Sequence, residues 1–204
     1  MVNLIPSPES VMQILYKTNA YRYGHFVSQS GRHSSHYFKV PMAFHISDNA
    51  RILAVGLSRK FRMDRNTAGL LPHIAVVSPS ADGIPVAFSI RDALNGEQIY
   101  WATRENGRRQ FPDYIKNFKI KPCIIVDDIV RSGSTLLETH RLLKDLGATV
   151  IGFGTIVKFK TAPKEIESIE IKSLVEFDSP IFDTLAEWQT ADGNDAPEEK
   201  IIEF

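Results

Sequence analysis

The chain has 204 residues with 24 basic and 24 acidic side chains, so its formal net charge is zero. This balance argues against nucleic acid or a membrane surface as a partner. No run of about 18 apolar residues is present to span a bilayer. The length suits one domain, or one domain with a small appended hood. The lone Cys123, in an apolar run, is expected to be a packed thiol, and without a disulfide partner or a leader segment we expect a cytoplasmic protein.

Apolar spacing predicts the elements of the N-terminal half. Residues 7–24 contain a helical pattern, and a turn and strand are predicted to follow over 26–40. A second helix is predicted over 47–61. Residues 73–94 then pass from a short apolar run through small polar residues into a helical pattern, which indicates strand, loop and helix in that order.

The same alternation continues in the C-terminal half. The polar, basic stretch 106–122 has little periodicity and is predicted to be a mobile loop. The other segments are predicted as strands over 97–105, 122–128, 149–159 and 171–177 and as a helix over 133–148 that ends at Gly147. Strands alternating with helices indicate right-handed crossovers and a largely parallel sheet covered on both faces, so the predicted fold class is α/β.

Two adjacent carboxylates, Asp127 and Asp128, end one of the predicted strands. Ligands of parallel sheets bind beyond such ends, and alternation along the strand predicts different contacts for the two acids. The loop 131–135 that follows has a glycine and three hydroxyls and runs into a helix start, which favours a phosphate. A sugar phosphate would suit this arrangement, because the carboxylates could accept hydrogen bonds from ribose hydroxyls while the loop binds the phosphate. The competing interpretation is an ordinary turn and capped helix with solvated acids.

The segment CIIVDDIVRSGST, residues 123–135, resembles the phosphoribosyl pyrophosphate signature of type I phosphoribosyltransferases. Three other segments are similar to orotate phosphoribosyltransferases: 24–40 to their N-terminal segment, 78–87 to their pyrophosphate loop and 102–109 to their flexible catalytic loop. The resemblance implies the type I phosphoribosyltransferase fold, with residues 1–45 and about 172–204 contributing a hood and tail to a single domain 1–204. It also implies a homodimer and a Mg²⁺-dependent transfer of ribose 5-phosphate from phosphoribosyl pyrophosphate to a nitrogenous base.

The resemblance implies a role for each group of residues. Asp127 and Asp128 would bind the ribose hydroxyls, directly or through magnesium-bound water. The 5′-phosphate would be bound by Arg131, Ser132, Gly133, Ser134 and Thr135, and pyrophosphate by Ser80, Ala81, Asp82 and Gly83. A closing loop would carry Arg104, Arg108 and Arg109, which would reach a neighbouring subunit's site. The base would be contacted by Tyr37, Phe38 and Lys158. Arg32, His33 and Ser34 are further candidates. The pyrophosphate loop could instead be an ordinary turn between a strand and a helix. The three arginines could lie on a solvated surface loop, and Tyr37 and Phe38 could serve only to pack a strand.

Several positions depart from the orotate pattern. Arg131 stands where threonine is usual, Asp82 replaces a common lysine, and the flexible loop lacks the usual lysine and histidine. Lys158 and Phe159 occupy the place of an Asp-Arg pair whose arginine meets the orotate carboxylate. The acceptor is therefore left open between orotate and another base. Two other functions also stay open: a non-catalytic sensor of phosphoribosyl pyrophosphate or a nucleotide, and hydrolysis or phosphorolysis of a nucleoside phosphate.

Overall fold

The computed structural model describes residues 5–28, 31–117, 119–191 and 201–202. Its core is a six-stranded sheet in the order β4-β3-β7-β8-β10-β9, in which every pairing is parallel except that of β9 with β10. The strands of this sheet are β3 Ala75–Ser78, β4 Gln98–Trp101, β7 Cys123–Val130, β8 Val150–Phe159, β9 Glu165–Ile166 and β10 Ile169–Phe177. The α/β fold class, with a largely parallel sheet, is confirmed.

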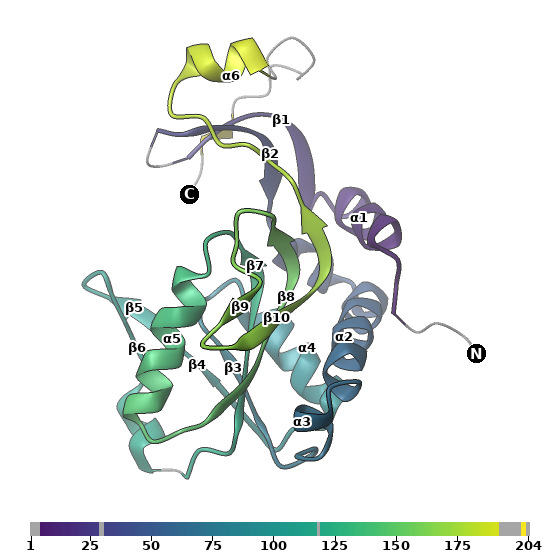
Figure 1. The fold of residues 1–204 in the computed structure, drawn as a ribbon. Coiled ribbons are helices and arrows are strands. Elements are labelled where there is room, and N and C mark those ends of the chain that lie inside the picture. Colours follow the sequence, from purple (N-terminus) through teal and green to yellow (C-terminus); the bar gives the residue numbers. More distant parts are fainter. Residues whose placement is uncertain (1–4, 29–30, 118, 192–200, 203–204) are drawn as a thin grey trace.

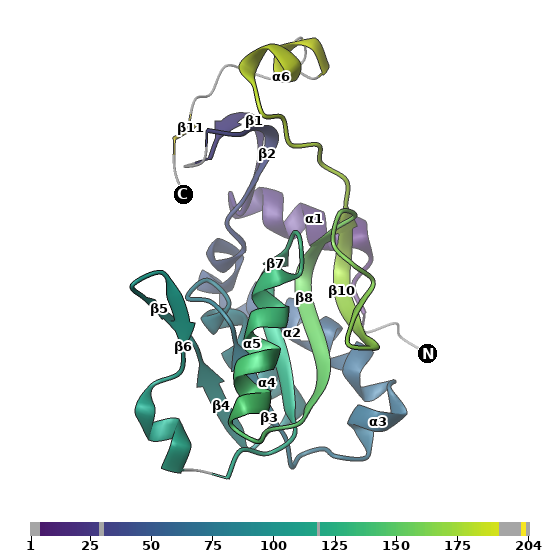
Figure 2. The same ribbon diagram turned by 60° about the vertical axis from the view of Figure 1, so that its left-hand side comes forward.

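Helices cover both faces of this sheet (Figures 1 and 2). Side-chain alternation along β7 shows the two layers. Ile124 and Val126 pack with helices formed by residues 8–17, 47–62 and 84–94, whereas Cys123 and Ile125 pack with the helix formed by residues 134–145 on the opposite face. The helical segments are α1 Pro8–Lys17, the 3₁₀ helix η1 Val40–His45, α2 Ser47–Arg62, α3 Arg65–Ala68, α4 Ile84–Leu94, the 3₁₀ helix η2 Asp113–Asn117, α5 Ser134–Asp145 and α6 Leu185–Ala191. None of the helices in the described ranges is long and apolar enough to cross a bilayer.

A small hood lies beyond the end of the sheet where β8 and β10 finish (Figures 1 and 2). It contains β1 Tyr21–Val27, antiparallel to β2 His33–Phe38, together with β11 Ile201–Ile202, parallel to β1. Helix α6 packs on this sheet, and Trp188 Nε1 donates a hydrogen bond to Ser35 Oγ at 2.8 Å. The hood joins two stretches of chain that are far apart in sequence.

The boundaries of the hood differ from those expected. Residues 172–177 belong to β10 of the core, so the C-terminal part of the hood begins after Phe177 rather than at about residue 172. At the other end, α1 packs on the core through the fully buried Val11 and Leu15. Residues 192–200 and 203–204 of the expected tail, and residues 29–30 of the segment that resembles orotate phosphoribosyltransferases, lie outside the described residues.

Most predicted elements are confirmed, but three segments differ. The first helix ends at Lys17 because Thr18 caps it and Asn19 adopts a left-handed conformation (φ 56°), so residues 21–24 start β1 instead. The predicted strand 97–105 is divided after β4 into a second strand, β5 Thr103–Glu105. Strand β7 continues two residues past Asp128, so the acid pair lies inside the strand and not at its last residue.

The prediction of an irregular loop over 106–122 is wrong for part of that stretch, because residues 108–110 and 113–117 form regular structure. Strand β6 Arg108–Gln110 pairs antiparallel with β5, and η2 follows it. Asn106 and Gly107 join the two strands with φ angles of 51° and 75°. An Asn-Gly pair with two positive φ angles forms the tight turn that matches the twist of a hairpin. Figure 1 shows this β5–β6 hairpin projecting from the edge of the molecule.

Candidate active site

A cavity of about 270 Å³ lies where β7 ends. Asp127 and Asp128 both line it, and Asp82 reaches it from the loop between β3 and α4. Phe38 and Lys39 enter from the end of β2. A further wall is formed by Arg131, Ser132 and Gly133 from the loop after β7 and by Thr135 from the first turn of α5. Three segments that are distant in sequence therefore meet at the carboxyl end of the parallel sheet, the end at which such sheets bind ligands.

Asp127 is buried and held by two hydrogen bonds. Its Oδ1 accepts from Ser80 Oγ at 2.6 Å and from the Asp128 backbone N–H at 3.1 Å. Burial raises the pKa of Asp127 to about 6, although the Ser80 hydrogen bond opposes the shift. Burial, together with the neighbouring charge of Asp127, also raises the pKa of Asp128 well above its usual value. Both carboxylates would be stabilised in their charged form by a cation or by hydroxyl donors in the cavity.

The loop between β3 and α4 supports Asp127 from behind. Ser78 Oγ donates to the Ser80 carbonyl at 2.7 Å, and the Gly83 N–H donates to Ser80 Oγ at 3.0 Å. A Cβ atom at Gly83 would lie 2.6 Å from both Asp127 Oδ1 and Ser78 Oγ, so only glycine fits. Of the four residues expected to contact pyrophosphate here, Asp82 lines the cavity and Ala81 is exposed.

Asp82 does not bring an uncompensated negative charge into the site. Its Oδ2 accepts a hydrogen bond from Lys39 Nζ at 2.9 Å. This hydrogen bond raises the pKa of Lys39, and the negative charge of Asp128 acts in the same direction. Lys39 was not among the residues foreseen from the sequence. Its position directly after Phe38, an aromatic already singled out, is the only sequence signal that pointed to it.

The loop after β7 has the geometry of an anion cradle. Gly133 adopts a left-handed conformation, with φ 78°, directly before the first residue of α5. The hydroxyl oxygens of Ser132 and Ser134 lie 2.9 Å apart. Because α5 begins at Ser134, the N–H groups of its first turn have no partner within the helix.

The three arginines expected on a closing loop lie together on the β5–β6 hairpin. Arg109 is buried, and its Nε donates to Glu138 Oε2 on α5 at 3.0 Å. Arg104 approaches the same oxygen at 3.9 Å, while Arg108 is exposed. Burial raises the pKa of Asp127, and the positive charge of Arg109 opposes that rise, so this arginine lies near the cavity of its own chain. Glu138 was not foreseen, because 29 residues separate it from Arg109.

The residues expected to contact a base separate into two groups. Phe38 lines the cavity and packs against Phe159, with ring centroids 5.7 Å apart. Tyr37 is buried in the hood against Phe26 and does not line the cavity. Lys158 is also buried, and its Nζ pairs with Glu176 at 2.6 Å, away from the cavity walls.

These features define an α/β fold with a polar cavity at the carboxyl end of its parallel sheet, and comparison with known proteins identifies the family. Residues 44–188 match the phosphoribosyl transferase domain family, and the chain belongs to that family. The resemblance inferred from the signature segment is thereby confirmed, as is the enzyme class, a glycosyltransferase that transfers pentosyl groups.

Several relatives of known identity are named orotate phosphoribosyltransferases. An orotate phosphoribosyltransferase of Thermotoga petrophila is 29% identical over 177 residues, which cover 85% of this chain and 88% of the relative. One from Pelotomaculum thermopropionicum is 30% identical over 152 residues, covering 73% and 74%. The solved orotate phosphoribosyltransferase from Aeropyrum pernix has a TM-score of 0.60 at 19% identity, covering 81% of this chain and 93% of that one. The Mycobacterium tuberculosis structure with inorganic phosphate has a TM-score of 0.58 at 20% identity, covering 83% and 96%. The solved structures show the shared fold.

Proposed function

We propose that this chain transfers ribose 5-phosphate from phosphoribosyl pyrophosphate to orotate and releases pyrophosphate, with Mg²⁺ as cofactor. The observation that carries the proposal is the single cavity that joins the acid pair, the hydroxyl-rich loop before α5 and the Lys39–Asp82 ion pair. The name shared by the curated relatives supports orotate as the acceptor. We also propose a cytoplasmic homodimer whose subunit is one domain with a hood.

The donor set fits a magnesium ion that arrives with its substrate. No group of three histidine, cysteine or acidic side chains in the described ranges is arranged to hold a metal alone. Mg²⁺ is commonly bound by one or two carboxylates, with waters and phosphate oxygens completing its coordination. Asp127 and Asp128 would supply those carboxylates, directly or through water. Burial raises the pKa of both groups, so a bound cation would stabilise their charged form. When bound, the ion would neutralise charge on the pyrophosphate.

The remaining chemistry is assigned to side chains of this chain. The acid pair would accept hydrogen bonds from the ribose hydroxyls, while the N–H groups and hydroxyls from Ser132 to Thr135 would hold the 5′-phosphate. Positive charge develops at the sugar C1 as pyrophosphate leaves, and the nearby carboxylates stabilise it. Lys39 and the hairpin arginines Arg104, Arg108 and Arg109 would stabilise the negative charge of the leaving group and exclude water.

Not every residue first considered for the base keeps that role. Phe38 is retained because its ring lines the cavity. We do not retain Lys158, since its ammonium is paired with Glu176 and its side chain is only 7% exposed. Tyr37 is assigned to the packing of the hood.

The test is turnover with a panel of bases. Purified protein is incubated with phosphoribosyl pyrophosphate and orotate, uracil, adenine or hypoxanthine, with Mg²⁺ or with a chelator, and pyrophosphate release is followed. We expect release that requires both orotate and Mg²⁺. Binding of phosphoribosyl pyrophosphate without release for any base would identify a sensor, and release without any base would identify a hydrolase. Either result would overturn the proposal.

A further inference from the structure

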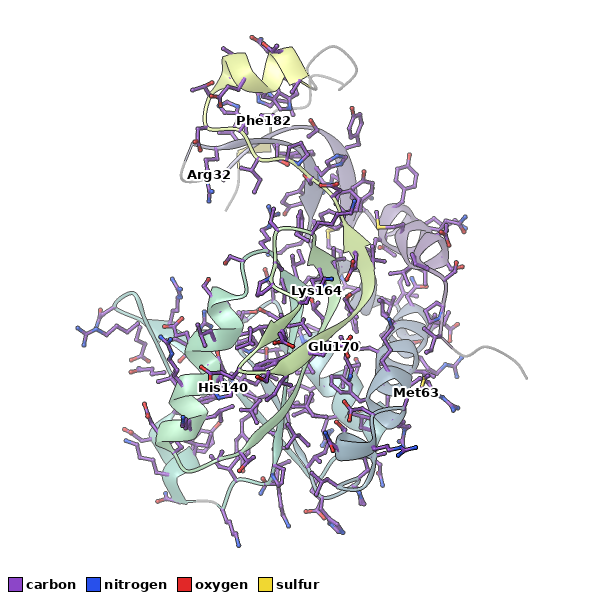
Figure 3. The ribbon with its side chains drawn as sticks, in the orientation of Figure 1. Arg32, Met63, His140, Lys164, Glu170 and Phe182 are labelled. Atoms are coloured by element: carbon purple, nitrogen blue, oxygen red, sulfur yellow. The ribbon has the colours of Figure 1, made fainter. Side chains whose placement is uncertain are left out.

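The β5–β6 hairpin is fixed to α5 both at its base and at one arginine. Figure 3 shows the hairpin beside α5, the helix that carries the labelled His140. Shortly after the hairpin, the buried Ile115 of η2 packs in the same apolar cluster as Leu136 of α5. Within β6, Arg109 is buried while its neighbour on either side is exposed, so the side chain of Arg109 is turned toward α5 and theirs are turned away.

Two arginines lie directly opposite each other across this hairpin. Arg104 of β5 and Arg109 of β6 are partners in the antiparallel register, so their side chains share one face of the strand pair. Like charges at directly opposite positions are destabilising. A carboxylate that contacts both guanidinium groups would offset this repulsion.

Glu138 of α5 is that carboxylate. Its Oε2 accepts a hydrogen bond from Arg109 Nε at 3.0 Å and lies 3.9 Å from Arg104 Nη2. Among the described residues, no other acid forms an ion pair with either arginine. The Arg109 side chain is only 5% exposed, so removing its anionic partner would leave a buried charge uncompensated. One carboxylate balances one of the two positive charges and leaves the other for an anionic ligand.

The position of Glu138 on α5 connects the arginines with the cavity at the acid pair. Glu138 follows Thr135, which lines that cavity, by three residues, so the two side chains lie on the same side of the helix. Burial raises the pKa of Asp127, and the charge of Arg109 opposes this rise. The anchored arginine is therefore within electrostatic reach of the acid pair, and its anchor lies one turn from the loop expected to hold the 5′-phosphate.

The leaving group of the proposed transfer needs positive charge at this place. As the bond between the sugar C1 and the pyrophosphate oxygen breaks, its electron pair goes to pyrophosphate, and cationic donors already in position stabilise that charge. Without Glu138, Arg104 and Arg109 would repel each other, and the hairpin would lose its polar contact with α5. A misplacement of a reacting or stabilising group by about 1 Å can slow a reaction about 100-fold.

We propose that Glu138 is a positioning residue for the transfer reaction, which binds Arg104 and Arg109 from α5 and holds them where they stabilise the leaving pyrophosphate. The inference rests on the proposed transfer to orotate, and it adds a residue that need touch neither substrate. Two turns of one helix then have two tasks. The first turn of α5 binds the 5′-phosphate, and the second turn places the arginines.

The test compares Glu138→Gln with Asp145→Asn, a matched control at an exposed position at the end of the same helix. Pyrophosphate release gives kcat and separate KM values for orotate and for phosphoribosyl pyrophosphate. Glutamine keeps an acceptor oxygen but not the charge, so kcat should fall roughly 10- to 100-fold, as expected for misplaced arginines. The KM for orotate should stay nearly constant, and Asp145→Asn should behave as wild type.

Arg109→Gln and the double variant show whether Glu138 acts through the arginines. Residues that work as one unit are strongly non-additive, so Glu138→Gln should lower kcat by only about 3-fold or less when Arg109 is already glutamine. Loss of packing alone would instead give fold losses that multiply. Glu138→Asp keeps the charge on a shorter side chain and should show an intermediate loss. This variant keeps the inference testable if Glu138→Gln fails to fold, as thermal unfolding would reveal.

The possible outcomes separate this inference from the proposed function. An unchanged or higher kcat in the folded Glu138 variants, or losses that multiply in the double variant, would overturn the role of Glu138 and leave the proposed function intact. An inactive wild-type protein with orotate would overturn the proposed function, and this inference with it.

Discussion

Replacing Asp127 with asparagine should make the metal-free protein more stable at neutral pH. Asparagine has nearly the same shape, and its Oδ1 can keep both hydrogen bonds, from Ser80 Oγ and from the Asp128 N–H. The change removes a carboxylate whose pKa is raised by burial from 3.8 to about 6. Each unit of pKa difference corresponds to about 1.4 kcal/mol, so ionising Asp127 costs the folded state roughly 3 kcal/mol.

The sign of this effect follows from proton linkage. The folded protein binds the Asp127 proton more tightly than the unfolded chain, so wild-type stability decreases as the pH rises from about 4 through about 6. The variant lacks this contribution. Its advantage should be absent near pH 4 and reach about 3 kcal/mol at pH 7 to 8, a rise in Tm of roughly 6–12 °C for a chain of this size.

The assay is thermal unfolding in a chelating buffer across this pH range. Asp145→Asn, at an exposed position at the end of α5, serves as the matched control. A variant less stable than wild type at pH 8, or parallel pH profiles for the two proteins, would refute the assignment of a strained buried charge. Binding of phosphoribosyl pyrophosphate with Mg²⁺ should weaken in the variant, because the site would lose one of its two carboxylates.

Three further changes test the site from other directions. Gly83→Ala should destabilise the protein by about 1–3 kcal/mol, since the new Cβ would overlap Asp127 Oδ1. Gly69→Ala is the control and should not destabilise the protein, because the nearest atom to its new Cβ is 3.6 Å away. Thermal unfolding of the two variants distinguishes these outcomes. Lys158→Met should leave the KM for orotate unchanged and cost about 1 kcal/mol or less, because Glu176 is 60% exposed; a large rise in that KM would restore Lys158 as a base contact. The Cys123 thiol, whose pKa burial raises to about 12, should react with a thiol reagent at pH 8 only on unfolding, and rapid labelling of the folded protein would contradict its burial.

Structural features formed by a single short segment of the chain were predictable from the sequence. The segment 123–135 holds a strand, a turn and a helix start, so the acid pair and the loop after it were identified together with their place at the end of the sheet. The layered α/β fold was predicted because segments with strand-like and helix-like spacing of apolar residues alternate along the chain. The β5–β6 hairpin was missed although Asn106 and Gly107 carried its signal, because the polar residues around them lack any apolar alternation.

Contacts between distant segments were not predictable. Lys39 pairs with Asp82, although 43 residues separate them in sequence. The sequence alone suggested that Asp82 makes the site more negative where a lysine is common, but the positive charge of Lys39 compensates it. Lys158 faces Glu176 because β8 and β10 pair in that register, and the spacing of residues within either strand does not specify the register. The stacking of Arg131 on Phe159 likewise depends on where β8 ends relative to the loop after β7.

Direct detection of the products tests the central claim most directly. Phosphoribosyl pyrophosphate, orotate and Mg²⁺ are incubated with the wild-type protein and with the Asp127→Asn/Asp128→Asn double variant, and the nucleotide and pyrophosphate are quantified by phosphorus NMR. The cavity at the acid pair predicts equal amounts of orotidine 5′-phosphate and pyrophosphate from wild type and a strongly reduced yield from the folded variant. No nucleotide from wild type, or equal yields from both proteins, would contradict the account.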